Sequence, residues 1–124
     1  MAGFEHLLDS CDVGDMLDEI ASADPPAYLR RCFAEGCSAP SLSWARVQQL
    51  ALCAMVLDAI VNHQDYPVLE PELIADWRLH YAQDCRHMQE VAMLALQRAE
   101  ESSRTHDPDA AAELSELELR LAPA

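Results

Sequence analysis

Apolar residues recur at helical spacing along most of the chain, and this pattern predicts helices throughout. The longest unbroken pattern runs from Pro71 to about Ser103, where it predicts one continuous helix of about 30 residues, or ~45 Å at the standard helical rise. Glu70 and Glu72 give this helix a favourable start. Its apolar side consists of Ile74, Trp77, Tyr81, Cys85, Met88, Ala92, Ala95, Leu96 and Ala99.

A second segment, residues 42–64, is apolar nearly all round from Leu50 to Val61. Such a pattern is typical of a central helix that packs on several sides. Its narrow polar strip includes Asp58 and Asn62. We interpret Asp58 as a residue at the rim of the core beside Asn62, rather than as a buried functional acid.

The first 24 residues contain two amphipathic stretches whose apolar sides point in opposite directions. The phase changes at Asp12 and Gly14, and this change predicts a break or kink between two helical stretches. The kinked N-terminal segment, residues 1–24, carries several acids and no base.

Helix start and stop signals mark the remaining elements. Asp24 and Pro25 suit the start of a short helix, and Gly36 suits its left-handed exit. Residues 108–124 predict an acidic amphipathic helix, which either packs on the bundle or stays mobile until a partner orders it. No linker or repeat divides the chain, so we expect one all-α domain over residues 1–124, a compact bundle of about five helices.

The composition is strongly acidic, with 22 Asp and Glu residues against 8 basic residues and a formal net charge of −14. All the bases are Arg, which excludes a P-loop lysine, a Schiff-base lysine and the usual polybasic membrane patch. A surface this negative repels nucleic-acid phosphates, so we expect no direct binding to nucleic acid. It suits a protein partner with a basic or grooved surface, although negative charge can also serve solubility alone.

Sequence features also bear on the compartment. The N-terminal sequence lacks a basic region followed by a long apolar stretch, so it does not resemble a signal peptide. The most apolar run, residues 51–61, is shorter than the ~20 residues that a membrane span needs, and it contains Asp58. The five cysteines, an odd number, lie mostly in helical patterns. We therefore expect reduced thiols in a cytoplasmic protein, with no membrane partner.

The stretch DWRLHYAQDCRHMQE, residues 76–90, places two acids and two imidazoles on one side of the predicted helix. Carboxylate and imidazole groups at successive turns can share a metal ion. Such a site requires a second acid-x-x-His pair, which the sequence lacks, and Arg78 and Arg86 are placed to pair with the acids. We therefore interpret the stripe as a solvated helix face and expect no metal or other cofactor, with a metal site as the alternative. Its four residues are Asp76, His80, Asp84 and His87.

On the side of this helix that carries His80 and His87, the residues become Val91 and Leu94 toward the C-terminus. A helix that is apolar on two sides contacts two surfaces. The second surface is a partner protein or a second copy of the chain, with packing inside one chain as the alternative. We expect these four residues and a set of acids to form the partner surface. The acids are Asp9, Asp12, Asp15 and Asp18.

The sequence has no Gly-flanked Ser, no glycine-rich phosphate loop and no HExxH motif, so we expect no enzyme activity. We predict a non-enzymatic acidic helical protein that binds and regulates another protein, as an inhibitor, anti-activator, immunity protein or chaperone does. One alternative is a metal-binding or redox helical bundle centred on His80, Asp84 and His87. A second is a DNA mimic, an inhibitor whose carboxylates imitate the spacing of phosphates.

Overall fold

The computed structural model describes residues 6–9 and 11–122, and this part of the chain folds into six α-helices without strands. The all-helical, compact architecture predicted from the sequence is confirmed. The helices are α1 (Val13–Ser22), α2 (Pro25–Ser38), α3 (Trp44–Asn62), α4 (Pro71–Arg86), α5 (Gln89–Ser103) and α6 (Pro108–Leu121).

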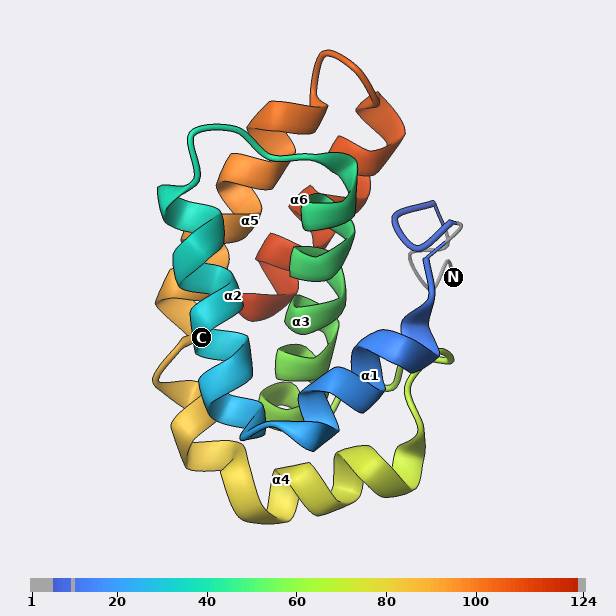
Figure 1. Cartoon of the computed structure of the whole chain (residues 1–124), viewed down its shortest axis with the longest axis vertical. Helices are drawn as coiled ribbons and strands as arrows, with labels where there is room; N and C mark the ends of the chain where they lie inside the picture. Colours follow the sequence, from blue (N-terminus) through green and yellow to red (C-terminus); the bar gives the residue numbers. More distant parts are fainter. Residues whose placement is uncertain (1–5, 10, 123–124) are drawn as a thin grey trace.

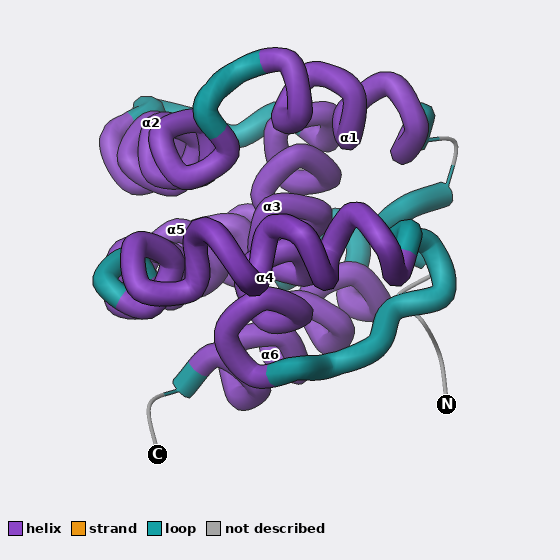
Figure 2. Tube along the Cα trace, turned by 90° about the horizontal axis from the view of Figure 1, so that it is seen from below, coloured by secondary structure: helices purple, strands orange, loops and turns teal. Residues whose placement is uncertain are grey.

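The central helix is α3, as its all-round apolar pattern predicts. Every residue from 50 to 60 is buried, and α3 packs against α2, α4, α5 and α6. In Figure 1, α4 runs across one end of the bundle, and α1 crosses the front near the same end. Figure 2 shows α1 and α2 on one side of α3 and α6 on the opposite side.

The predicted 30-residue helix over 71–103 is wrong, because the chain bends at His87 and Met88 and makes two helices, α4 and α5. At the bend the backbone N–H of Met88 donates to the carbonyl of Cys85 at 3.2 Å, which is a tighter turn than an α-helix makes. The longest helix among the described residues is therefore α3, with 19 residues. The bend lets α4 lie against α2 and α3 while α5 runs along α2, α3 and α6, which one straight rod could not do.

The N-terminal segment breaks at Asp12, where the change of phase predicts a break. Asp12 caps α1, since its Oδ1 accepts a hydrogen bond from the backbone N–H of Asp15 at 3.0 Å. Before the break, residues 6–9 form a turn rather than the helix that the sequence indicates. We call residues 6–9 the N-terminal strap.

Hydrogen bonds join the N-terminal strap to α3 and α6. His6 Nε2 lies 2.8 Å from both carboxylate oxygens of Asp107, the N-cap of α6. The backbone N–H of Leu7 donates to Glu113 Oε1 at 3.0 Å. From α3, the Gln48 amide donates to the carbonyl of Asp9 at 2.7 Å. These contacts hold Leu7 and Leu8 buried in the core. Their burial explains why this segment is apolar although it forms no helix.

Gly36 has another role than the predicted left-handed exit, because α2 continues through it to Ser38. A Cβ atom on Gly36 would lie 2.9 Å from both Cδ atoms of Leu50 and 3.4 Å from Cβ of Ala95. The glycine therefore permits α2, α3 and α5 to approach closely. Arg98 completes this junction by donating from Nη1 to the carbonyl of Gly36 at 2.7 Å and to that of Cys37 at 3.0 Å.

The C-terminal helix packs on the bundle, which is one of the two outcomes left open for it. Leu114, Leu117 and Leu121 of α6 are fully buried, and α6 packs against α5 and α3. Residues 123–124 of the predicted segment lie outside the described residues.

Among the described helices, α3 alone is long and apolar enough to cross a membrane, with a mean hydropathy of 1.3 over its most apolar 18 residues. However, 72% of that window is buried inside the bundle. The core helix of a soluble protein meets the same criterion, so α3 gives little support for a membrane span.

Candidate functional site

The predicted metal stripe lies on the outer side of α4. Asp76, His80, Asp84 and His87 are all exposed, and Nδ1 of His80 lies 3.3 Å from Oδ1 of Asp76. His87 is the C-cap residue that directly follows α4. Within residues 6–9 and 11–122, no three His, Cys, Asp or Glu side chains are grouped so that they could hold a metal ion. The stripe therefore has the exposure of a solvated helix face.

Val91 and Leu94 lie on α5 and are covered unequally. Leu94 is 50% exposed. Val91 packs partly against the core, and its carbonyl accepts a weak hydrogen bond from the Cys37 thiol at 3.7 Å. Packing within the chain therefore accounts for part of Val91, whereas Leu94 is available for contact with another molecule.

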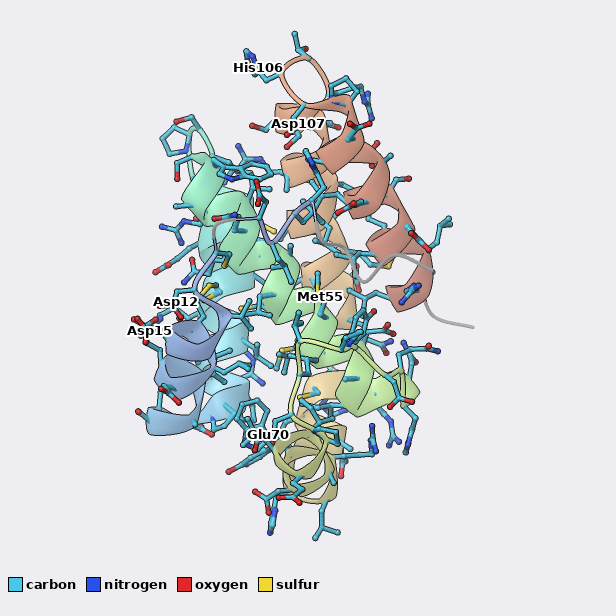
Figure 3. The ribbon with its side chains drawn as sticks, turned by 90° about the vertical axis from the view of Figure 1, so that its right-hand side faces the viewer. Asp12, Asp15, Met55, Glu70, His106 and Asp107 are labelled. Atoms are coloured by element: carbon cyan, nitrogen blue, oxygen red, sulfur yellow. The ribbon has the colours of Figure 1, made fainter. Side chains whose placement is uncertain are left out.

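The four acids of the predicted partner surface are exposed on the N-terminal strap and α1. Figure 3 shows Asp12 and Asp15 on the outer side of α1. The negative charge of Asp12 raises the pKa of Asp15 above its ordinary value, and Asp18 adds to this effect. No described arginine or histidine forms an ion pair with Asp9, Asp12, Asp15 or Asp18. The negative charge of this region is therefore concentrated and is not compensated by any ion pair among the described residues.

The structure does not bring these acids together with Leu94. α2 packs against α1 on one side and α5 on another, whereas α1 and α5 have no substantial contact. Arg30 and Arg31 of α2 are exposed. The predicted partner surface therefore consists of an acidic part on α1 and an apolar part on α5, separated by a helix that presents positive charge.

A cleft that the sequence did not indicate lies where α3 ends and α4 begins. It encloses about 550 Å³, within the range of small-molecule pockets. Residues of α3, of α4 and of the connection between them line it. The lining includes Ala59, Tyr66, Pro67, Leu69, Ile74 and Arg78.

Behind one wall of the cleft lies a buried polar network. Asp58 is fully buried and accepts hydrogen bonds from the Asn62 amide at 2.7 Å and from the Tyr66 hydroxyl. Nη1 of Arg120 donates to the Tyr66 oxygen at 3.2 Å. Burial, together with the bond to Asp58, raises the pKa of Tyr66 above its ordinary value. These contacts join α3, the connection to α4 and α6.

The interpretation of Asp58 as a residue at the rim of the core is wrong, because its side chain is fully buried within this network. α3 ends at Asn62, and its C-cap His63 has the left-handed conformation, with φ of 57°. The chain then turns back, so that Tyr66 covers Asp58. Tyr66 and Leu69, two large apolar residues in the connection, were the signal for a packed loop, and both are buried.

Arg78 belongs to the polar part of the cleft wall, together with Gln64 and Asp65. Its Nη2 donates to the carbonyl of Ala59 in the last turn of α3 at 2.7 Å, which satisfies an acceptor that the helix itself leaves open. Its Nε is buried without a hydrogen-bond partner. A buried donor of a charged group without an acceptor costs free energy and requires an explanation.

Comparison with known proteins identifies no relative: the chain matches no protein-family model, no curated protein and no solved structure.

Proposed function

We propose that this protein is a non-enzymatic cytoplasmic regulator that binds a basic surface of another protein, as an inhibitor, anti-activator, immunity protein or chaperone does. The observation that carries the proposal is the uncompensated charge of Asp9, Asp12, Asp15 and Asp18. All four are exposed and lack ion-pair partners within the described chain. Concentrated charge of one sign steers an oppositely charged partner and speeds its association.

The short-range contact in this proposal comes from α5. Leu94 is half exposed, and the exposed part of Val91 extends the apolar surface. His80 and His87, both exposed, belong to the same proposed surface on the α4 side. Because Arg30 lies exposed on the intervening α2, a partner that contacts both parts needs basic groups opposite α1 and none opposite α2. This charge pattern gives specificity as well as rate.

The proposal is tested by neutralising the acids of α1. The partner is first isolated from host extract on the immobilised full chain, and its association rate is then measured over a range of salt concentrations. The test variant changes Asp9, Asp12, Asp15 and Asp18 to Asn, which keeps the helix cap at position 12. We expect association to slow by roughly tenfold or more and its salt dependence to flatten.

A matched control neutralises four exposed acids elsewhere and should leave the rate near that of the wild type. These acids are Asp65, Glu70, Glu72 and Asp109. Equal rates for the wild type and the α1 variant would remove the steering proposal. In a second arm, Leu94→Ser, which adds no charge, should speed dissociation while leaving association nearly unchanged. Competition by duplex DNA for the same partner would identify the protein as a DNA mimic.

A further inference from the structure

The cleft at the junction of α3 and α4 has features that partner binding through α1 and α5 does not use. Its walls are mostly apolar, with Pro67, Leu69 and Ile74 among them, and one guanidinium, that of Arg78, reaches them. Pockets of this kind, apolar with a few polar groups, are the usual form of small-molecule sites. The cleft therefore has a chemical character of its own.

Arg78 supplies the observation that indicates a ligand. Its Nη2 bonds the carbonyl of Ala59, and its Nε is buried with no acceptor in the described structure. Nε and Nη2 form one edge of the guanidinium, the edge that binds a carboxylate through two parallel hydrogen bonds. Because Nε is buried in this structure, the side chain must rotate for Nε to meet an acceptor in the cleft. A carboxylate there would satisfy the unpartnered donor.

The rest of the lining defines the body of the ligand. Leu69 and Ile74 are buried apolar residues, and Pro67 and Pro71 restrict the backbone that carries the wall. A branched aliphatic group fits such a surface by burial of apolar area. A second charged group on the ligand would lie near Asp65, which also lines the cleft.

We propose that this cleft binds a small aliphatic carboxylate, with the carboxylate on Arg78 and the branched body against Leu69 and Ile74. The inference is independent of the proposed partner surface. The shared chemistry belongs both to branched-chain fatty acids and to branched-chain amino acids. The two sources differ in the ammonium group, for which Asp65 is the counter-ion that the cleft offers.

The experiment is calorimetric titration of the full chain with three probes: 4-methylpentanoate, leucine and 4-methylpentan-1-ol. We expect saturable binding of one equivalent of at least one of the two carboxylates and none of the alcohol, which has the aliphatic body without the charge. Leucine as the tighter probe, with its advantage lost in Asp65→Asn, would identify an amino-acid site. 4-Methylpentanoate as the tighter probe would identify a simple carboxylic-acid site.

Arg78→Lys is the central variant, because lysine keeps the positive charge and loses the planar fork. We expect it to weaken carboxylate binding by roughly tenfold or more. Arg98→Lys is the matched control, since Arg98 also bonds carbonyls at a helix end but lies outside the cleft, and binding should be unchanged.

Residue-resolved amide NMR shifts on the wild-type chain keep the proposal testable if a variant fails to fold. The shifts that accompany the titration should centre on Tyr66, Leu69 and Ile74. Equal binding of the alcohol, shifts confined to other helices, or no saturable binding by either carboxylate would overturn the proposal. The last result would leave water as the acceptor for Arg78.

Discussion

Two carboxylates at the interfaces of α6 lie in contrasting surroundings. Asp58 of α3 is fully buried, yet the Asn62 amide and the Tyr66 hydroxyl both donate to it. Glu118 of α6 is only partly buried, but its Oε2 is enclosed without a donor. Its neighbour there is a second acid, Glu100 of α5.

The difference shows that depth of burial does not by itself determine the free-energy cost of burying a carboxylate. That cost also depends on which hydrogen-bond donors reach the carboxylate. Burial and hydrogen bonding with Glu100 raise the pKa of Glu118 to about 8. Glu118 therefore retains its proton at neutral pH and can donate it to Glu100. The same bond, with the bond from Arg104, lowers the pKa of Glu100. Side-chain donors therefore satisfy the carboxylate of Asp58, whereas Glu118 is accommodated by keeping its own proton.

The largest effect on stability is expected when the Asp58 carboxylate is removed. In Asp58→Ala the Tyr66 hydroxyl loses its acceptor in the protein interior, whereas the exposed Asn62 can turn toward water. We expect the free energy of unfolding to fall by about 2–3 kcal/mol, measured by urea denaturation near neutral pH. Asp65→Ala, an exposed acid in the adjacent connection, should change it by less than about 0.5 kcal/mol. Similar values for the two variants would show that the network adds nothing to stability.

The second test isolates Glu118 by comparing the pH dependence of stability of the wild type with that of a Glu118 variant. Because its pKa in the folded protein, about 8, exceeds its ordinary value of 4.5, the folded state binds this proton more tightly than the unfolded state. The stabilisation is full below the ordinary value and is lost as pH rises through the folded value. Glu118→Gln cannot ionise and still offers Glu100 a donor. After allowance for solvent screening, we expect the variant to exceed the wild type by ~1 kcal/mol above about pH 8.

The pH dependence of this difference is the decisive readout. Urea midpoints of the wild type and Glu118→Gln should converge as pH falls toward 5 and diverge as it rises toward 9. Glu90→Gln, an exposed change on α5, should follow the wild type at every pH. A constant offset between Glu118→Gln and the wild type would contradict the raised pKa.

The smallest effect is expected from Arg104, whose Nη2 lies 2.8 Å from Glu100 and whose side chain is 65% exposed. An exposed ion pair contributes little to stability and is screened by salt. Arg104→Ala should therefore shift the urea midpoint less than either variant above. Its clearer effect is electrostatic: the charge of Arg104 lowers the pKa of Glu118, so its removal should raise that pKa further. Carbon-13 NMR titration of the Glu118 carboxyl measures this shift, and a downward shift would contradict the arrangement.

The sequence predicts the helices where local signals are sufficient. Pro25, Pro71 and Pro108 each stand at the first position of a helix, and the all-round apolar pattern identifies α3 as central. The bend at His87 left no such signal, because Cys85 and Met88 on either side of it both remain buried. The apolar stripe therefore continues through a break that packing against other helices imposes.

The features of the candidate site also divide into those that the sequence predicts and those that it does not. The exposure of Asp12, Asp15 and Leu94 follows from periodicity along a single helix. The network around Asp58 depends on Arg120, which is distant in sequence, and no local pattern connects the two residues. The cleft depends in turn on how α4 is placed against α3. Features made by two elements therefore require the three-dimensional structure.

The N-terminal strap joins positions 101 and 106 residues apart, through His6 with Asp107 and Leu7 with Glu113. During synthesis on the ribosome, residues 6–9 are made before α6, and their binding surface is incomplete until α6 has been made. Leu7 and Leu8 consequently stay exposed to water, or to chaperones, until then. The earliest of the described residues to be made are thus among the last to reach their native positions.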